Sequence, residues 1–482
     1  MSNIFYRYRP LSRLLGEKDK HGVRQGRSEL KDLKIFFASP AQLNDPLEGY
    51  KEIFWEGDQV VWENLFRGYV LSLLNTMIEF EAVDEASTIT DKVSARTYLS
   101  DFPIEGLKLA IPICEEILSN DFLREFIEFI SIKKIRMDRL ELLTHLRNFH
   151  LWILSVVAAH IELYRPDYHN LFSTFSKYNL ITEQHYKEHA FDIMKIGDRL
   201  IFSESNAIHT ETELLNYCKK YDPATFKPNR MFLIVGYSEK YLESLESLLE
   251  PKWYSASFMS DCTNSAMWGG YAENHTGACL IYRTHGTDVN SSISIKKKNG
   301  FNRQNPTYGL VPTELRKVSY DGDHVVLDFF GSLLSLPAPE LNKNWLTTPE
   351  GRKSLLLERF KCLTEKQRES YWYAINTAAT AKIDAWKYEN EYRLILRDGF
   401  SVVTPEDQYA AYDFLNLEGV IFGIKTPTLE KVNMIRILHK HCIEQSRTEF
   451  KFYQARYDAT QRKIVTILLP TITLDALIDS IN

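Results

Sequence analysis

The sequence predicts an α+β protein in which a β-rich core is interrupted by a long helical segment. Strand-like runs bounded by turn residues occupy both ends of the chain, and helical periodicity dominates from about residue 60 to residue 250. The 482 residues are 44% hydrophobic and 25% charged, which is typical of a folded protein. We therefore expect the core in residues 1–57 and 251–482, and a helical insertion in residues 58–250.

The first 50 residues carry two short strands and a turn. Residues 4–9 predict a short strand that stops at Pro10, and residues 33–39 predict an apolar strand that stops at Pro40. Asn44-Asp45-Pro46 then predicts a rigid turn, because Asn and Asp bond their own backbone and Pro fixes φ.

The central segment has apolar residues at three- and four-residue spacing. Over residues 120–164 the three- and four-residue spacing of apolar residues is interrupted between Ile135 and Leu140. We therefore expect two amphipathic helices there. Further helices are expected over residues 178–202 and 242–249, and an isolated strand over residues 231–236.

The last part of the chain returns to strands. We expect helices over residues 345–385 and from Thr426-Pro427 to His439, where Thr is the N-cap. The expected strands are residues 252–258, 277–282, 292–296, 316–320, 386–396, 419–423, 450–456 and 463–468.

The charge distribution gives no sign of an intrinsic basic nucleic-acid-binding patch. The net charge is −6, and the densest basic run, Lys296-Lys297-Lys298, precedes Asn299-Gly300. Because Asn-Gly favours a hairpin turn, we interpret this run as a solvated turn.

The chain carries no signal of secretion, membrane insertion or metal binding. Its first residues lack a long apolar core, and the apolar stretch 151–159 is too short to span a bilayer. Six cysteines are scattered without a Cys-x-x-Cys pair, which argues against a zinc site or a disulfide framework. We expect a cytoplasmic protein with no membrane partner and no metal.

Glu389 and Glu391 form the best candidate for chemistry. On a strand, residues two apart point the same way, with side chains roughly 6–7 Å apart at their bases, so one carboxyl pKa should rise. Lys387 and Arg393 flank the pair on the same face. The alternative is therefore a solvated charged face that adds little stability.

Three residues of a polar turn region are also candidates. His275 could act as an acid, a base or an acceptor-site residue, or could be a structural hydrogen-bonding residue. Trp268 and Tyr271 could stack on a ligand or could pack between sheet and helix.

Two possible metal sites are discounted. Asp45 and Glu48 have no further ligands nearby in the sequence. His185 and His189 lack the Glu of a His-Glu-x-x-His zinc motif, so we interpret them as a surface pair.

Four segments resemble a bacterial family known as domain of unknown function 2971. They are residues 6–10, 37–46, 267–277 and 386–393, and the resemblance covers roughly residues 1–55 and 250–425. The most specific segment runs from Met267-Trp268-Gly269-Gly270-Tyr271 to Gly277. The family name implies no function.

A more distant resemblance is to ADP-ribosyltransferases of the Arg, Ser-x-Ser, Glu-x-Glu type. The matching pieces are Tyr6-Arg7-Tyr8, Ser255-Ala256-Ser257 and Glu389-Asn390-Glu391, in the same order. This resemblance implies a split-sheet core and NAD as a substrate.

The same resemblance implies a role for each matching residue. Arg7, with Tyr6, would bind the phosphates of NAD, and Arg9 on the same strand face is the alternative. Ser255 opens the Ser-x-Ser element that supports the catalytic carboxylate, and Ser257, like Trp268, Tyr271 and His275, would belong to the NAD-binding site. Glu391 would stabilise the oxocarbenium charge on ribose, and Glu389 would orient or deprotonate the acceptor.

The expected function is therefore an NAD-dependent ADP-ribosyltransferase or NAD glycohydrolase, with an unknown protein or nucleic-acid acceptor and a role in bacterial defence. The second hypothesis is a non-catalytic nucleotide-sensing or protein-interaction module. The third is a hydrolase that uses Glu389, Glu391 and His275.

Overall fold

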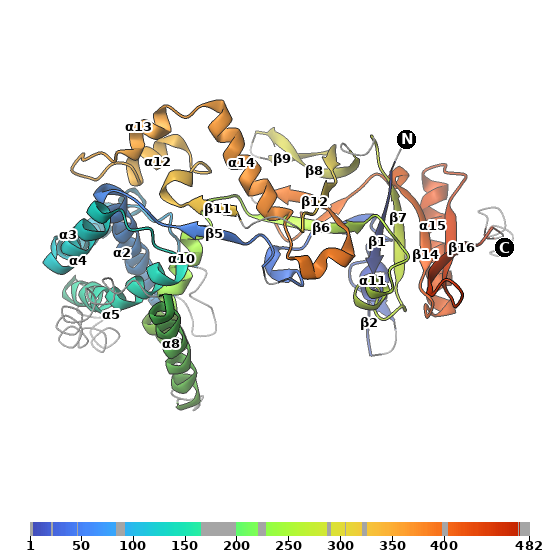
Figure 1. Ribbon diagram of the computed structural model, residues 1–482, viewed down its shortest axis with the longest axis horizontal. Helices are drawn as coiled ribbons and strands as arrows, with labels where there is room; N and C mark the ends of the chain where they lie inside the picture. The colour runs from blue at the N-terminus through green and yellow to red at the C-terminus, as the bar shows by residue number, and fades with distance from the viewer. Residues whose placement is uncertain are drawn as a thin grey trace. The chain divides into compact units, whose positions relative to one another are not determined.

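The computed structural model shows a mixed α+β protein (Figure 1). It describes residues 3–20, 23–45, 47–82, 92–164, 199–219, 228–286, 291–303, 305–320, 325–397, 403–470 and 472. The chain divides into two compact units. Unit 1 combines Met1–Tyr50, Pro251–Asp323 and Asn376–Asn482, and unit 2 combines Lys51–Glu250 with His324–Ile375.

Unit 1 is built on an eight-stranded sheet with the order β10-β12-β6-β1-β7-β14-β15-β16. Most neighbours are antiparallel, but β14 and β15 are parallel because helix α15 (Thr428–Glu444) connects them as a crossover. The strands are β10 (Arg316–Lys317), β12 (Glu391–Arg397), β6 (Trp253–Met259), β1 (Ile4–Arg9), β7 (Ala278–Arg283), β14 (Leu417–Phe422), β15 (Lys451–Asp458) and β16 (Lys463–Leu468).

The two faces of this sheet support separate cores. The face that we call the α15 face carries Phe5 and Phe258, which belong to one apolar cluster with Leu438 of α15. The opposite α11 face carries Tyr8, which belongs to a second cluster with Trp268 of helix α11 (Ser265–Gly270). Side chains alternate along each strand, so the strand position of a residue decides which core it joins.

Shorter elements complete unit 1. They are α1 (Leu11–Leu15), η1 (Pro40–Gln42), η8 (Asp384–Glu389), η9 (Phe414–Asn416) and the strand pairs β2–β3 (Glu17–Lys18, Arg24–Gln25), β4–β13 (Lys34–Phe36, Tyr409–Ala411) and β8–β9 (Ser292–Asn302, Asn305–Glu314).

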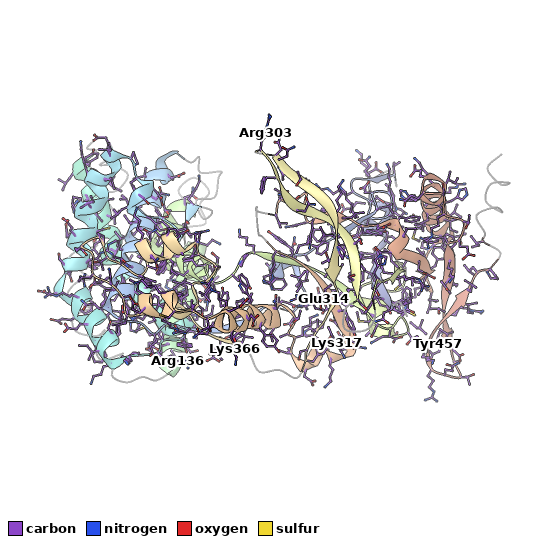
Figure 2. All side chains as sticks on the ribbon, turned by 90° about the horizontal axis from the view of Figure 1, so that it is seen from above. Arg136, Arg303, Glu314, Lys317, Lys366 and Tyr457 are labelled. Carbon is purple, nitrogen blue, oxygen red and sulfur yellow. The ribbon has the colours of Figure 1, made fainter. Side chains whose placement is uncertain are left out.

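The β8–β9 hairpin corrects the predicted turn at Asn299-Gly300. Lys296, Lys297 and Lys298 all lie within β8, and a register shift between Lys298 and Gly300 absorbs the Asn-Gly pair without ending the strand. The chain reverses near Arg303, which lies at the end of the hairpin (Figure 2). Lys298 forms an ion pair with Asp407, at 2.7 Å, so this part of the run is not a freely solvated turn.

Unit 2 is mainly helical, and its core includes Trp62, Phe66, Phe126 and Phe149. Its helices are α2 (Gln59–Ala82), η3 (Leu99–Asp101), α3 (Ile104–Ser119), α4 (Asp121–Lys133), α5 (Arg139–Tyr164), α8 (Arg199–Lys219), α9 (Pro228–Met231), η5 (Phe232–Gly236), α10 (Tyr237–Glu246), η7 (Phe330–Ser332), α12 (Ala338–Asn344) and α13 (Leu356–Lys361). Helix α14 (Glu365–Ala379) begins in this unit, and strands β5 (Lys51–Phe54) and β11 (Val325–Asp328) form a parallel pair.

One helical prediction and one strand prediction for unit 2 have clear outcomes. The predicted break is confirmed, because α4 ends at Lys133, Lys134 adopts the left-handed conformation, and α5 begins at Arg139. The predicted strand over residues 231–236 is wrong, because Phe232–Gly236 form a π-helical turn between α9 and α10. A short apolar run fits a buried helix as well as a strand. The helix expected over 178–202 lies outside the described residues except for the start of α8.

Across the described parts of the chain, each helix is either too short or too polar to traverse a bilayer.

Gly423, directly after β14, packs closely against the segment before β7. Its N–H donates to the carbonyl of Gly277, at 3.1 Å, and a Cβ at this position would collide with the carbonyl oxygens of His275 and Gly277. We expect Gly423→Ala to lower the free energy of unfolding by about 2 kcal/mol, measured by urea unfolding of the full chain.

Gly269→Ala is the matched control, because no atom lies within 4 Å of its added Cβ. It should be neutral or slightly stabilising, since alanine favours helix over glycine. Equal midpoints for the two variants would contradict the close packing at Gly423.

Candidate functional site

The segment with the two candidate carboxylates is not one continuous strand. Asp384–Glu389 form a 3-10 helix, Asn390 adopts the left-handed conformation at φ 45°, and β12 begins at Glu391. The strand predicted from residue 386 is therefore wrong in its first half. The alternating residue pattern there resembles a strand, but Asn is one of the few residues that readily adopt the left-handed turn.

Both carboxylates nevertheless enter one buried charge cluster, formed by Glu48, Lys382, Glu389, Glu391 and Arg393. Lys382 Nζ lies 2.6 Å from Glu389, 3.0 Å from Glu391 and 3.3 Å from Glu48. Arg393 donates to both oxygens of Glu391, at 2.9 and 3.0 Å, and to Glu48, at 2.7 Å. All five residues lie in unit 1.

The cluster is shielded from solvent. The side chains of Glu389 and Arg393 are 0% exposed, and that of Lys382 is 5% exposed. The alternative of a solvated charged face is therefore wrong for Glu389, Glu391 and Arg393. Three carboxylates face two cations, so the cluster carries one negative charge in excess when all five groups are ionised.

The pKa values differ from the sequence expectation. Burial alone would raise the pKa of Glu391, but Arg393 and Lys382 reverse this effect and lower it to about 2. The raised carboxyl pKa belongs to Glu48, where burial outweighs the attraction of Arg393 and Lys382. Burial disfavours the charged form of Lys382, yet the three carboxylates raise the pKa of this ammonium group above its ordinary value.

Tyr271 closes the cluster on one side. Its hydroxyl donates to Glu389, at 2.5 Å, and accepts from the side-chain amide of Asn44, at 3.1 Å. Tyr271 follows α11 directly and is partly exposed, whereas Asn44 is exposed. The Tyr271 hydroxyl therefore stands between Glu389 and the exposed Asn44 side chain.

Trp268 and His275 serve the packing of the same segment. Trp268 is fully buried, packs edge-on against Tyr8 and donates its indole N–H to the carbonyl of Cys262, at 2.9 Å. The His275 ring stacks on Trp268, with centroids 6.4 Å apart. Among the described contacts, none joins His275 to the charge cluster. Of the two alternatives for Trp268, packing against the sheet fits the structure, and stacking on a ligand does not.

The Ser-x-Ser element lies beside the carboxylates. Strand β6 pairs with β12 so that Ser257 is opposite Arg393 and Ser255 is opposite Ile395, all on the α11 face. Ser257 shares this face with Glu391, and its side chain helps to lower the pKa of that carboxyl group. Ser255 is buried, and among the described residues its hydroxyl has no hydrogen-bond partner.

The structure separates the two arginines of β1 from these groups. Because side chains alternate, Arg7 and Arg9 lie on the α15 face with Phe5, and Tyr6 lies on the α11 face. Arg7 is buried over the ring of Phe258 and donates to a backbone carbonyl in β4. Arg9 forms an ion pair with Glu29.

Most of the predicted site residues therefore lie on the α11 side of the sheet, whereas Arg7 and Arg9 lie on the α15 side. Those on the α11 side are Tyr6, Ser255, Ser257, Tyr271, Glu389 and Glu391. Tyr6 and Glu391 are both opposite Met259, which places them in one row across β1, β6 and β12. The expectation that Arg7 or Arg9 contacts the same ligand as Glu391 is not met by this geometry.

The sequence reasoning missed two members of the cluster. The sequence suggests Glu48 only as a possible metal ligand, and no pattern in it points to Lys382.

Within the described ranges, no group of His, Cys, Asp and Glu is suited to hold a metal ion. One signal was available for Arg393, because it lies between Tyr392 and Leu394 in a strand with an apolar face, where a buried charge requires a partner.

Comparison with known proteins gives one match. Residues 267–394 match the family described as protein of unknown function (DUF2971). This range includes the last four residues of α11, Tyr271 and the cluster residues from Lys382 to Arg393, and it leaves out β1 and Glu48. No curated protein and no solved structure matches this chain, so the resemblance to ADP-ribosyltransferases gains no support from them.

The lowered pKa of Glu391 predicts a pH-dependent contribution to stability. Its stabilising charge is fully present above its ordinary pKa of about 4.5 and is lost as pH falls towards about 2. Linkage converts this shift to about 3 kcal/mol. We expect Glu391→Gln to lower the free energy of unfolding most at pH 7, and the difference from wild type to shrink between pH 4.5 and pH 2.5.

Urea unfolding at several pH values measures this difference. Glu314→Gln is the control, because Glu314 is exposed at the end of β9 and should shift stability little at any pH. A wild-type minus Glu391→Gln difference that stays constant down to pH 2.5 would contradict the charge pairing.

Proposed function

We propose that the α11 face around Glu391 is the active site of an NAD-cleaving enzyme, either an ADP-ribosyltransferase or an NAD glycohydrolase. One observation carries the proposal: neighbouring strands place Ser257 on the same face as a carboxylate, Glu391, that Arg393 and Lys382 hold ionised. The order of the matching sequence elements adds to it, since β1, β6 and β12 are consecutive neighbours in the sheet.

The chemistry suits an ionised carboxylate. In the reaction, the bond between nicotinamide and the ribose anomeric carbon breaks, and its electron pair leaves with nicotinamide. The ribose acquires oxocarbenium character, which a nearby negative charge stabilises. Water or an acceptor group then adds to the anomeric carbon and loses a proton. With a pKa of about 2, Glu391 stays negative at neutral pH and suits charge stabilisation rather than proton donation.

Glu389 is the group that we assign to the acceptor. Its carboxylate is held by the Tyr271 hydroxyl and by Lys382, and its side chain is buried. The partly exposed Tyr271 and the exposed Asn44 lie on one side of it, so the Tyr271 side chain would have to turn away when the acceptor enters. An incoming hydroxyl would replace the tyrosine hydroxyl as the donor to Glu389.

The proposal differs from the sequence expectation in its cofactor contacts. Tyr6 and Tyr271 are partly exposed aromatic side chains of this face near Glu391 and could stack on a base, in place of the buried Trp268. Arg7 and Arg9 are left out because they lie on the α15 face, and no side chain is assigned to the pyrophosphate.

A second candidate is a non-catalytic binding or sensing module. It is favoured by the burial of the charge cluster, in which every carboxylate already has a cationic partner. Such a network can specify a unique fold without contacting any ligand. A hydrolase that uses Glu389, Glu391 and His275 gains no support, since the ring of His275 stacks on Trp268.

Nicotinamide release from NAD tests the first candidate. The purified chain is incubated with NAD, alone and with cell lysate as a source of acceptors, and nicotinamide is measured by chromatography. We expect release to fall at least about 100-fold in Glu391→Gln, because a fixed charge next to the oxocarbenium centre is lost. Ser257→Ala, which removes a hydroxyl that favours the charged form of Glu391, should lower nicotinamide release by about tenfold.

The controls separate lost chemistry from lost fold. Glu314→Gln should release nicotinamide like wild type, and the urea midpoints of all variants show that they are folded. Wild-type silence under both conditions would exclude the NAD-cleaving proposal and favour the non-catalytic candidate. Undiminished release by a folded Glu391→Gln variant would exclude Glu391 as the catalytic carboxylate.

A further inference from the structure

Unit 2 contains a pocket of about 670 Å³ that is separate from the charge cluster of unit 1. Its walls come from α2, from residues 95–100, from α3 and from the segment that includes α12 and residues 345–349. The volume lies within the range of about 300–1,000 Å³ that is usual for small-molecule sites.

One face of α2 supplies the polar floor of the pocket. Asn64, Arg67, Gly68 and Leu71 are spaced three and four residues apart, so they share this face. The Asn64 amide donates to the carbonyls of Trp345 and Thr347, at 2.9 and 3.2 Å, which fixes its orientation. Its oxygen then accepts a hydrogen bond from the Arg67 guanidinium.

The guanidinium of Arg67 has unused donors. Among the described residues, Asn64 is its single hydrogen-bond partner, and none of the described carboxylates forms an ion pair with it. A guanidinium carries five N–H donors, so most of them are available to a ligand in the pocket. Arg67 is partly buried, which strengthens its attraction for an anion relative to a cation in open water.

The charged side chains in the described lining of the pocket are both positive. Its described lining includes Arg67 and Lys343 but no aspartate or glutamate. Three carboxylates lie near this lining, and each has a cationic partner. Glu63 and Glu350 pair with Arg352, the latter at 3.8 Å, and Glu340 accepts both bonds of Arg96, at 2.9 and 2.8 Å. Glu350 also attracts Arg67 electrostatically. An anionic ligand would therefore meet two cations without a competing acidic side chain in the wall.

The remaining wall is largely apolar. Leu71 faces Leu107 and Ile111, which are one helical turn apart on α3. Ile111 is 41% exposed, which is high for an isoleucine side chain in a helix that packs on a core. Apolar walls around a few convergent polar groups are typical of a ligand site.

We propose that this pocket binds a small molecule that carries a phosphate or carboxylate group on an apolar or aromatic body. The anionic group pairs with Arg67 and Lys343, and the body packs against Leu71, Leu107 and Ile111. A planar guanidinium held by Asn64 suits bidentate contact with either anion. The inference uses residues of unit 2 alone and does not depend on NAD cleavage.

Calorimetric titration of the full chain tests the proposal with two matched pairs of probes. AMP is compared with adenosine, and hexanoate with hexanol. We expect at least one anion to bind with one site per chain and at least about tenfold more tightly than its neutral counterpart. Arg67→Met should weaken that binding by about tenfold or more, whereas Arg124→Met, an exposed arginine of α4, should leave it unchanged.

A charge pair at the exposed wall gives a second test that does not touch a buried residue. Ile111→Glu should weaken anion binding several-fold through repulsion, and Ile111→Lys should preserve or strengthen it. The proposal is overturned if neither anion binds at millimolar concentration, or if binding is the same for anionic and neutral probes. Equal affinities of the Ile111→Glu and Ile111→Lys variants would also overturn it.

Discussion

The fully buried guanidinium of Arg393 ties together three distant parts of unit 1. It donates to Glu391 within its own strand, to Glu48 in the segment after η1, and to the carbonyl of Ala379 at the end of α14. Placing this charge out of water is costly, so the arrangement is stable only because carboxylates and a carbonyl satisfy the donors. The position of the loop before residue 50 and the start of β12 both depend on it.

The local elements of unit 1 follow from the sequence because short-range rules govern them. Pro10 ends β1, an apolar run marks β7, and helix α15 begins directly after Thr426-Pro427. The predicted N-cap is off by one residue, because Pro427 is the N-cap and the Thr426 hydroxyl donates to the carbonyl of Gly277. The segment before β12 departs from these rules. Its alternation continues through Tyr388, but Asn390 takes the left-handed conformation and breaks the strand.

The composition of the candidate site depended on long-range pairing that the sequence does not contain. Alternation along β1 already separates Tyr6 from Arg7. Which of the two shares a face with Glu391 is decided by the register through Met259 of β6. A register slip of one residue would exchange the two faces. Likewise, the pKa of Glu391 is lowered because Lys382 and Arg393 lie beside it. The sequence shows only its proximity to Glu389, from which we expect one of the two carboxyl pKa values to rise.

The order of strands in the unit 1 sheet has a consequence for synthesis on the ribosome. Strand β1 is made first, yet its neighbours β6 and β7 begin only at Trp253 and Ala278. Unit 2 is complete once Ile375 has been translated, whereas unit 1 still lacks β12, β14, β15 and β16 at that point. Strand β1 therefore has no partner strand while more than half of the chain is made. Its aromatic side chains are exposed during this time, so this strand would need protection from aggregation in the nascent chain.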